Sequence, residues 1–379
     1  MRRISILLTL VATACSPAED VLPPPSEPGA HLVTEGRVLR IGSVDGNSAG
    51  LLYVPRRPVF VSDSVVSVSN ALSEIRQYSL SGDLVRTVGR RGNGPGEFQA
   101  AYWHDYPGGS LLVVDQQTRA IVFDQDYMEV SRVPLAPALG FNNAPGVFDG
   151  RVLVGLGASR DRGTPGTNRY VRPDVPLWAL DLETGRMETL DRVPGRGMWF
   201  TPDDTGWGLP LGPRPALAAR GDWIAYSDGL GYRLRTYRTS EGWGEVILGL
   251  ASEPVTSRAL DRWVQEMGEI FEERGAPPAA SVLPDADPPL FDTMPGWTRL
   301  FFDHSSCLWA LRYQFPNSTE EAWDVLDPRG GWVATFESPP GFRLNDVRGN
   351  LAVGLESDEV GVEYLSVLTL NRRVGCELP

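Results

Sequence analysis

The chain has 379 residues, of which 42% are hydrophobic and 22% are charged, a composition that is ordinary for a folded protein with a substantial core. Its 35 basic residues, all of them arginine, stand against 48 acidic residues, which gives a formal net charge of −13. An acidic surface excludes general binding to nucleic acid, because that binding depends on cations that neutralise phosphates.

Residues 1–14 have the order of a secretory signal peptide, with a basic start, an apolar stretch over residues 4–11 and small residues at 12–14. The apolar stretch is too short to span a bilayer. Cys15 follows directly, and this arrangement resembles the lipobox of bacterial lipoproteins, in which the cysteine is acylated. The alternative is an ordinary signal cleavage site at residues 12–14, which would leave Cys15 unmodified.

Residues 15–35 are predicted to form a lipid-anchored, proline-rich tether. Between Ser16 and Ala30 the sequence has five prolines, three acidic residues and few apolar ones, so this segment cannot bury enough surface to fold by itself. A segment of this kind lets an anchored domain stand clear of a membrane. We therefore expect residues 36–379 to form the folded domain, placed in the bacterial envelope at the periplasm or outer membrane.

The folded part repeats one unit six times. Each unit has apolar, β-rich runs, a turn of the Ser81-Gly82-Asp83 kind and a closing strand. Successive turns are 43, 59, 57, 89 and 41 residues apart, and a repeat of about 40 to 45 residues with four short strands is typical of one propeller blade. The predicted fold is all-β, a six-bladed β-propeller, with blades near residues 59–89, 100–135, 147–195, 215–250, 297–340 and 342–372.

Closure of the ring requires an early segment that adds a strand to the last blade, because joining the chain ends in one sheet removes exposed edges. Two segments fit this role, residues 38–41 and residues 53–61. The sequence does not decide between them.

One loop and two strands carry a more specific signal. Residues 92–98 read GNGPGEF, residues 113–115 read VVD, and residues 119–124 read RAIVFD. These segments resemble the blade-linking loop and the two following strands of NHL-type six-bladed propellers. As a whole, the chain is similar to bacterial lipoproteins that are six-bladed β-propellers, and this resemblance implies the same ring of blades.

Three insertions lengthen the later repeats, at residues 159–173, 194–215 and 251–296. The third predicts a helix over about residues 255–275, because its apolar residues recur at helical spacing. These residues are Leu260, Trp263, Val264, Met267, Ile270 and Phe271. The apolar stripe is expected either to pack against a face of the propeller or to dock a partner.

Apart from Cys15, the chain has two cysteines, Cys307 and Cys376. In an oxidising compartment they can pair and pin the C-terminal tail to the fifth blade. The alternative is two separate thiols, with Cys307 buried among its apolar neighbours.

The histidines do not predict a metal site. The chain has three of them, and none is spaced from another as His ligands of zinc are. His104 is expected to pack at the surface where the chain enters the second blade, and His304 is expected to be solvated in a turn.

A carboxylate metal site is a separate hypothesis. The first clear strand of most repeats ends in a polar residue, and Asn70, Asp115, Asp228 and Glu356 offer oxygen ligands that suit Ca²⁺. Six-bladed lactonases of the gluconolactonase type use such a metal to polarise a carbonyl and activate water. The alternative is that these side chains accept backbone N–H groups of the next turn, and Arg312 at the matching position opposes a cation.

Loops on a rigid scaffold are where binding residues collect. The insertions carry arginines and tryptophans that are candidate ligand contacts: Arg160, Arg169, Trp199 and Trp207. The alternative is that the tryptophans only pack these loops onto the ring.

From these observations we expect an exported, lipid-anchored, monomeric β-propeller that acts as a noncatalytic binding or scaffold module of the cell envelope. It needs no cofactor, contacts the membrane only through its anchor, and binds a protein, a small molecule or a glycan. The alternative function is a metal-dependent hydrolase, lactonase or lyase of the Ca type at the central mouth of the ring.

Overall fold

The computed structural model describes residues 30–42, 50–71, 73–106, 109–115, 118–135, 146–157, 161–248, 250–273, 275, 290–329, 331–372 and 376. The predicted signal peptide, Cys15 and most of the predicted tether lie outside the described residues.

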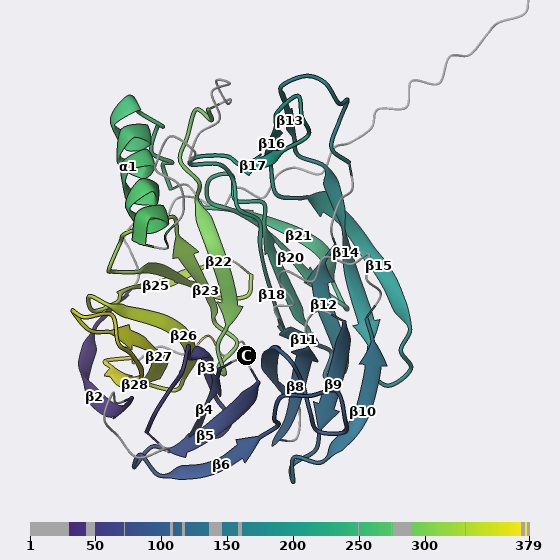
Figure 1. The fold of residues 1–379 in the computed structure, drawn as a ribbon, viewed down its shortest axis with the longest axis vertical. Coiled ribbons are helices and arrows are strands. Elements are labelled where there is room, and N and C mark those ends of the chain that lie inside the picture. Colours follow the sequence, from purple (N-terminus) through teal and green to yellow (C-terminus); the bar gives the residue numbers. More distant parts are fainter. Residues whose placement is uncertain are drawn as a thin grey trace, which may run out of the picture.

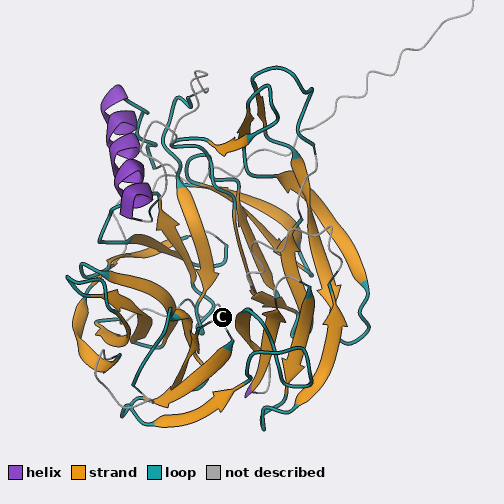
Figure 2. Ribbon diagram, in the orientation of Figure 1, coloured by secondary structure: helices purple, strands orange, loops and turns teal. Residues whose placement is uncertain are grey.

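Six four-stranded antiparallel blades form a ring around one axis (Figures 1 and 2). In each blade the first strand lies nearest the axis, and first strands of neighbouring blades contact one another around the ring. The predicted all-β propeller with one inserted helix is confirmed. Alternation of buried and exposed side chains along many strands accounts for this fold, because each sheet covers its neighbour with one face.

The strands of the first three blades are β3 (Arg56–Phe60), β4 (Val65–Asn70), β5 (Glu74–Ser79) and β6 (Leu84–Val88); β7 (Ala101–Tyr106), β8 (Ser110–Asp115), β9 (Arg119–Phe123) and β10 (Glu129–Pro134); and β11 (Gly146–Phe148), β12 (Val152–Leu156), β14 (Asp174–Asp181) and β15 (Met187–Pro194).

The strands of the last three blades are β18 (Ala216–Gly221), β19 (Trp223–Ser227), β20 (Arg233–Arg238) and β21 (Gly242–Ile247); β22 (Trp297–Phe302), β23 (Leu308–Arg312), β24 (Ala322–Leu326) and β25 (Trp332–Glu337); and β26 (Phe342–Arg348), β27 (Leu351–Ser357), β28 (Glu363–Leu370) and β2 (Thr34–Ile41).

An N-terminal strand closes the ring. β2 pairs antiparallel with β28 and becomes the outer strand of the last blade. Of the two candidate segments, residues 38–41 are therefore the closing one, while residues 53–61 supply the inner strand β3 of the first blade. The preceding β1 (Ala30–Leu32) adds in parallel to β25, so the start of the described chain also covers the outer edge of the fifth blade.

The third and fourth blades are joined at their inner strands, where β11 pairs in parallel with β18. Gly146 makes this pairing sterically feasible, because a Cβ at this position would lie 1.9 Å from the carbonyl oxygen of Ala219. Only glycine allows two backbones to approach this closely.

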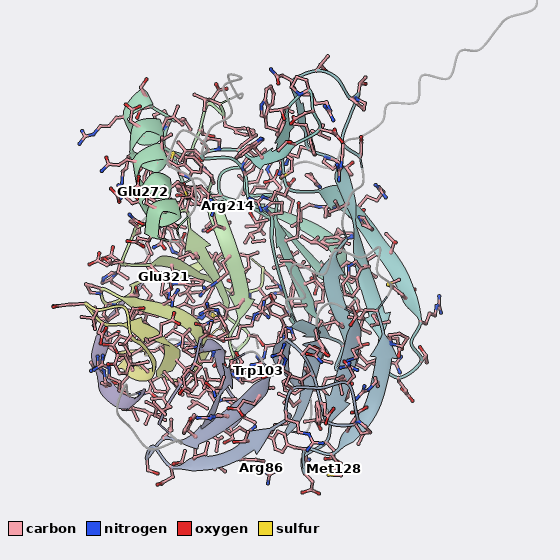
Figure 3. The ribbon with its side chains drawn as sticks, in the orientation of Figure 1. Arg86, Trp103, Met128, Arg214, Glu272 and Glu321 are labelled. Carbon is pink, nitrogen blue, oxygen red and sulfur yellow. A yellow bond between two sulfur atoms is a disulfide. The ribbon has the colours of Figure 1, made fainter. Side chains whose placement is uncertain are left out.

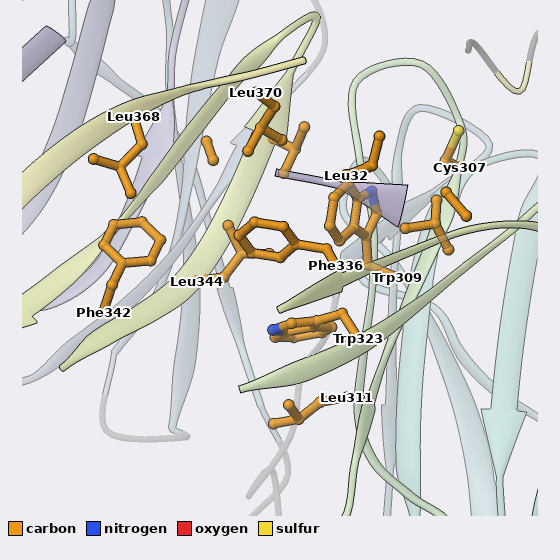
Figure 4. Close-up of a cluster of buried hydrophobic side chains, with 14 of the residues drawn as sticks. Leu32, Cys307, Trp309, Leu311, Trp323, Phe336, Phe342, Leu344, Leu368 and Leu370 are labelled. Atoms are coloured by element: carbon orange, nitrogen blue, oxygen red, sulfur yellow. The ribbon is translucent and has the colours of Figure 1, made fainter. Parts of the chain in front are cut away.

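The hydrophobic core lies between the blades. Figure 4 shows the cluster between the fifth and sixth blades, where Trp309, Trp323 and Phe336 pack against Phe342 and Leu344. Trp309 and Trp323 are 0% and 1% exposed. Each such residue contributes about 2 kcal/mol or more of burial free energy, so the interfaces between blades supply most of the stability.

The C-terminal tail is fixed to the fifth blade. Cys307 and Cys376 form a disulfide with their Cα atoms 5.1 Å apart. Next to it, the guanidinium of Arg372 lies 2.8 Å from the carboxylate of Asp303, and both side chains are buried. The carboxylate of Asp303 also accepts the indole N–H of Trp309 and the backbone N–H of Cys307, so the buried charge is paired and hydrogen-bonded.

The inserted helix α1 (Ser257–Glu273) packs against the ring. Its start is capped by Thr256, whose hydroxyl accepts the N–H of Ala259. Trp263 is buried in a cluster that also receives Met267 and Phe271. The apolar stripe is therefore covered by the protein itself, and the interpretation of α1 as a docking helix is wrong. Within the described ranges, no helix combines the length and apolar character that crossing a membrane requires.

We predict that Gly146→Ala lowers the free energy of unfolding by about 1–3 kcal/mol, because the new methyl group must push β11 away from β18. Urea-induced unfolding followed by tryptophan fluorescence measures this loss. Gly244→Ala is the matched control, since Gly244 lies on the outer strand β21 and a Cβ there would meet only Thr236 Oγ1 at 3.6 Å. Equal effects of the two substitutions would contradict the prediction.

Candidate functional site

A cavity of about 630 Å³ lies inside the ring and is called the central channel here. Residues of all six first strands, β3, β7, β11, β18, β22 and β26, line it. Figure 3 shows Trp103 of β7 near the middle of the ring, whereas Arg86 and Met128 lie at its periphery. The channel thus brings side chains from all six blades into a shared space.

The lining of the channel is basic. It contains five arginines and two histidines but a single acidic residue, Asp346. The arginines are Arg56, Arg57, Arg220, Arg299 and Arg343. This excess stands out because the whole chain carries a net charge of −13. A cluster of one sign in a cavity with low-dielectric walls focuses its field on the enclosed space, where it attracts an anion.

The channel has two different halves. The second and third insertions directly precede β18 and β22, so the starts of the first strands face the insertion side of the ring. Arg57 and Arg299 lie at such starts, in what we call the insertion half. Arg220 and Asp346 lie toward the other ends of their strands, in the far half.

Arg57 of the insertion half is held in an unusual backbone conformation. It has a φ of +47°, at a shift in the pairing of β3 with β4. A non-glycine residue in this region costs on the order of 1–3 kcal/mol and persists only where the surroundings enforce it. The shift lets Arg57 line the channel instead of continuing the regular ladder.

The Arg57 guanidinium has no carboxylate partner among the described side chains. Its Cζ lies 4.8 Å from the centre of the Tyr102 ring, which provides a cation–π contact. Burial lowers the pKa of Arg57, the phenol of Tyr102 raises it, and the nearby charge of Arg299 lowers it. An anion in the channel would relieve both the desolvation and the repulsion.

Arg299 is held between a carbonyl, a carboxylate and a ring. It donates to the carbonyl of Leu344, lies 3.8 Å from Glu321, and stacks 4.7 Å from the centre of the Trp323 ring. Burial lowers the pKa of Arg299, Glu321 raises it, and Arg343 lowers it. Glu321 also accepts the backbone N–H of Leu344, so its carboxylate interacts with this N–H as well as with Arg299.

Arg56 and Arg343 share one carboxylate. Arg56 Nη1 lies 3.3 Å from Glu363 Oε2, and Arg343 forms an ion pair with the other oxygen of the same group. Two guanidinium groups on one carboxylate leave positive charge uncompensated at this end of the channel.

The far half is built around His304. Its Nδ1 lies 2.7 Å from Arg220 Nη2 and 2.6 Å from Arg348 Nη2, and its Nε2 lies 3.0 Å from Asp346 Oδ2. Guanidinium N–H groups can only donate, so Nδ1 accepts and the ring proton is on Nε2, where it is donated to Asp346. Both ring nitrogens are engaged, so His304 is not available as a general base.

This network cross-links four blades. Arg220 comes from the fourth blade, His304 from the fifth and Asp346 from the sixth, while Asp346 also accepts the N–H of Phe60 in the first blade at 2.9 Å. The side chains of His304 and Asp346 are 9% and 7% exposed. The expectation that His304 is solvated is therefore wrong, because the ring closes around its turn.

Trp103 adds an unpaired donor to the wall of the channel. Its side chain is 1% exposed, and its indole N–H has no hydrogen-bond partner among the described residues. An orphaned buried donor is costly and is often satisfied by a ligand or a water molecule.

The structure does not bring the four predicted metal ligands together, and the described residues contain no group of three or more His, Cys, Asp or Glu side chains that could hold a metal ion. Asn70 accepts the N–H of Tyr53, and Asp115 accepts the N–H groups of Gln99 and Ala100 and pairs with Arg119 at 2.6 Å.

The other two candidates are also engaged within the ring. Asp228 accepts the N–H of Leu230 and lies 3.7 Å from Arg172, and Glu356 pairs with Arg37 at 2.7 Å. Asn70, Asp115 and Asp228 accept backbone N–H groups, which was the alternative interpretation, whereas Glu356 binds an arginine; the metal-site interpretation is wrong for this set.

The predicted ligand-binding loops form a structure of their own. Arg160 lies outside the described residues. Arg169 lies on β13 (Arg169–Val171) and pairs with Asp204, while Trp199 and Trp207 face each other across β16 (Met198–Phe200) and β17 (Gly206–Gly208). With Trp199 only 8% exposed, these side chains pack the insertion, and the structure does not place them in the channel lining.

Sequence reasoning missed the arginines of the channel. The signal was the recurrence of arginine at or near the start of a first strand, in Arg56-Arg57, Arg299 and Arg343. The polar residues at the ends of the second strands, which the sequence pattern pointed to instead, do not line the channel.

We predict that Asp346→Ala lowers the free energy of unfolding by about 2–3 kcal/mol, because it leaves the N–H groups of Phe60 and His304 without an acceptor in a buried site. Asp63→Ala is the control in the same network: Asp63 pairs with Arg348 at 3.0 Å but is 95% exposed, so its loss should cost less than about 0.5 kcal/mol. Urea denaturation of both variants gives the comparison, and similar losses would refute the structural role of Asp346.

No family model matches this sequence, and no curated protein matches it. Its fold is similar to that of a DUF4221 family member from Bacteroides vulgatus, with a TM-score of 0.55 and 10% identity over 90% of this chain and 98% of that one. Weaker similarity links it to the calcium-binding protein regucalcin from Agrobacterium tumefaciens, with a TM-score of 0.43 and 13% identity over 90% and 96% of the two chains. The β-propeller domain of Cps50 (Swd1) from Myceliophteria thermophila gives a TM-score of 0.40 and 11% identity over 87% and 98%. At these identities the comparison with the Bacteroides vulgatus protein supports the fold alone.

Proposed function

We propose that this chain is an exported, lipid-anchored binding protein of the bacterial envelope whose central channel holds a small anionic ligand without transforming it. One observation carries the proposal: five arginines and a single acidic residue line one cavity in a protein of net charge −13. Such a separation of charge is costly to the ligand-free protein, and an anion offsets that cost.

The size of the cavity favours a small molecule. About 630 Å³ lies within the range of small-molecule sites. The wall combines the guanidinium groups with apolar side chains such as Trp103, Leu217 and Leu300. Apolar walls with a few convergent polar groups are the usual composition of a ligand pocket.

The chemistry of the far half favours binding over catalysis. Both nitrogens of His304 and both oxygens of Asp346 are engaged in hydrogen bonds. A general base needs a free lone pair within reach of the substrate. The arginines stay protonated and supply positive charge and N–H donors, which serve recognition.

Placement in the envelope is supported by two features. The sequence of residues 1–15 has the order of a lipoprotein signal. The Cys307–Cys376 disulfide is of the kind that persists in oxidising compartments.

To test the anion site, the purified chain is titrated calorimetrically with small organic acids and with their neutral amides. We expect the acids to bind and the amides to bind at least tenfold more weakly, because a charge-assisted hydrogen bond contributes about 1.5–3 kcal/mol. Binding should weaken as NaCl is raised, since salt screens the arginine field.

Arg57→Met should weaken binding of the acids by about tenfold or more, because it removes the guanidinium that has no carboxylate partner in the described part of the chain. The matched control is Arg186→Met, on an outer turn of the third blade where the side chain is 78% exposed. If acids and amides bind equally, or if both variants behave alike, the anion-binding function is refuted.

The anchor gives a separate prediction. In a bacterial host fed labelled palmitate, the full chain should incorporate label and partition with membranes, and Cys15→Ser should abolish both, because the acylated sulfur is removed. Unlabelled but secreted wild-type chain would show that residues 12–14 are an ordinary cleavage site.

A further inference from the structure

The charges of the insertion half do not balance. Four guanidinium groups, those of Arg56, Arg57, Arg299 and Arg343, meet there. Among the described side chains, two carboxylates contact them, Glu321 beside Arg299 and Glu363 between Arg56 and Arg343. Counted over the described side chains, the insertion half therefore has a surplus of two positive charges.

In the far half, in contrast, the described basic groups are all engaged with other side chains. Among the described side chains, Asp346 accepts from His304, Asp63 pairs with Arg348, and Arg220 and Arg348 donate to Nδ1 of His304. All of these groups already bind one another across the blades. The attraction for an anion is thus concentrated at one end of the channel.

The geometry points to a compact organic dianion as the ligand, with its two negative charges at Arg57, Arg299 and Arg343 and its body along the apolar wall of the channel. This inference rests on the proposed function and specifies the ligand class for the same site. A phosphate monoester and a short dicarboxylic acid share this chemistry. Arginine suits both, because its planar fork binds carboxylate and phosphate oxygens in pairs.

Three features of the site support a dianion with a carbon body. The arginines are already fixed in place by the Tyr102 and Trp323 rings, so little conformational freedom is lost when they bind. The cavity is far larger than inorganic phosphate needs. Its wall includes the apolar ring of Trp103, which a carbon skeleton can contact.

The number of negative charges on the preferred ligand is tested with small carboxylic acids of similar carbon skeleton. Butyrate, succinate and tricarballylate carry one, two and three charges at pH 8, where carboxyl groups are ionised. Propyl phosphate, a dianion at the same pH, distinguishes a phosphate ligand from a dicarboxylate. We expect succinate or propyl phosphate to bind the purified chain about tenfold to a hundredfold more tightly than butyrate, and inorganic phosphate to bind more weakly than propyl phosphate.

Two variants change the surplus in opposite directions. Arg57→Met reduces it to one positive charge, so the ratio of dianion to monoanion affinity should fall toward one. Glu363→Gln raises the surplus to three by removing the carboxylate that Arg56 and Arg343 share, so tricarballylate should gain affinity relative to succinate. Arg186→Met again serves as the control, and thermal melting shows whether each variant is folded.

The outcomes separate this inference from the function on which it rests. If butyrate binds as tightly as the dianions, and Arg57→Met weakens all of them equally, the dianion inference is overturned while the anion site stands. If no acid binds the folded chain more tightly than its amide, both are overturned. If Arg57→Met lowers the preference for dianions and Glu363→Gln raises the preference for the trianion, the surplus of positive charge determines which anion binds.

Discussion

The structure depends on closure of the ring by the pairing of β2 with β28. This pairing joins the start of the described chain to the last blade, so that the six blades form one ring and their first strands lie around one axis. Residues that are far apart in the chain, such as Arg57 and Arg343, are thereby placed around one cavity. No single blade contains the site. The channel exists because the ring is closed, and its charge is a property of the assembled ring.

The fold could be predicted from the sequence because its signals are local. Alternating runs define the strands, and the spacing of apolar residues between Leu260 and Phe271 predicts the helix found at Ser257–Glu273. The channel could not be predicted in the same way. Which strand of a blade lies innermost is decided by packing between blades. The sequence alone therefore pointed to polar residues at the ends of the second strands as the candidate site. Asp115 illustrates the error, because Arg119, four residues away, already neutralises it.

Arginine is well suited to this channel because aromatic rings and carbonyl groups can fix its side chain without cancelling its positive charge. Tyr102 and Trp323 offer ring faces to Arg57 and Arg299, and the carbonyl of Leu344 takes one N–H of the latter. A guanidinium has five donors, so such contacts leave others for a ligand. A lysine ammonium would be more strongly hydrated and would lack the planar face that stacks on aromatic rings.

The two halves of the channel differ in role: the far half contributes to stability, and the insertion half is the part proposed to bind a ligand. In the far half, His304 and Asp346 use their polar atoms to join four blades. In the insertion half, Arg57 bears backbone strain and desolvation with no carboxylate in the described structure to relieve them. A fold tolerates such a residue only when other contacts supply the free energy. In the proposed function, a bound anion offsets part of this cost at the guanidinium of Arg57, which has no carboxylate partner among the described side chains.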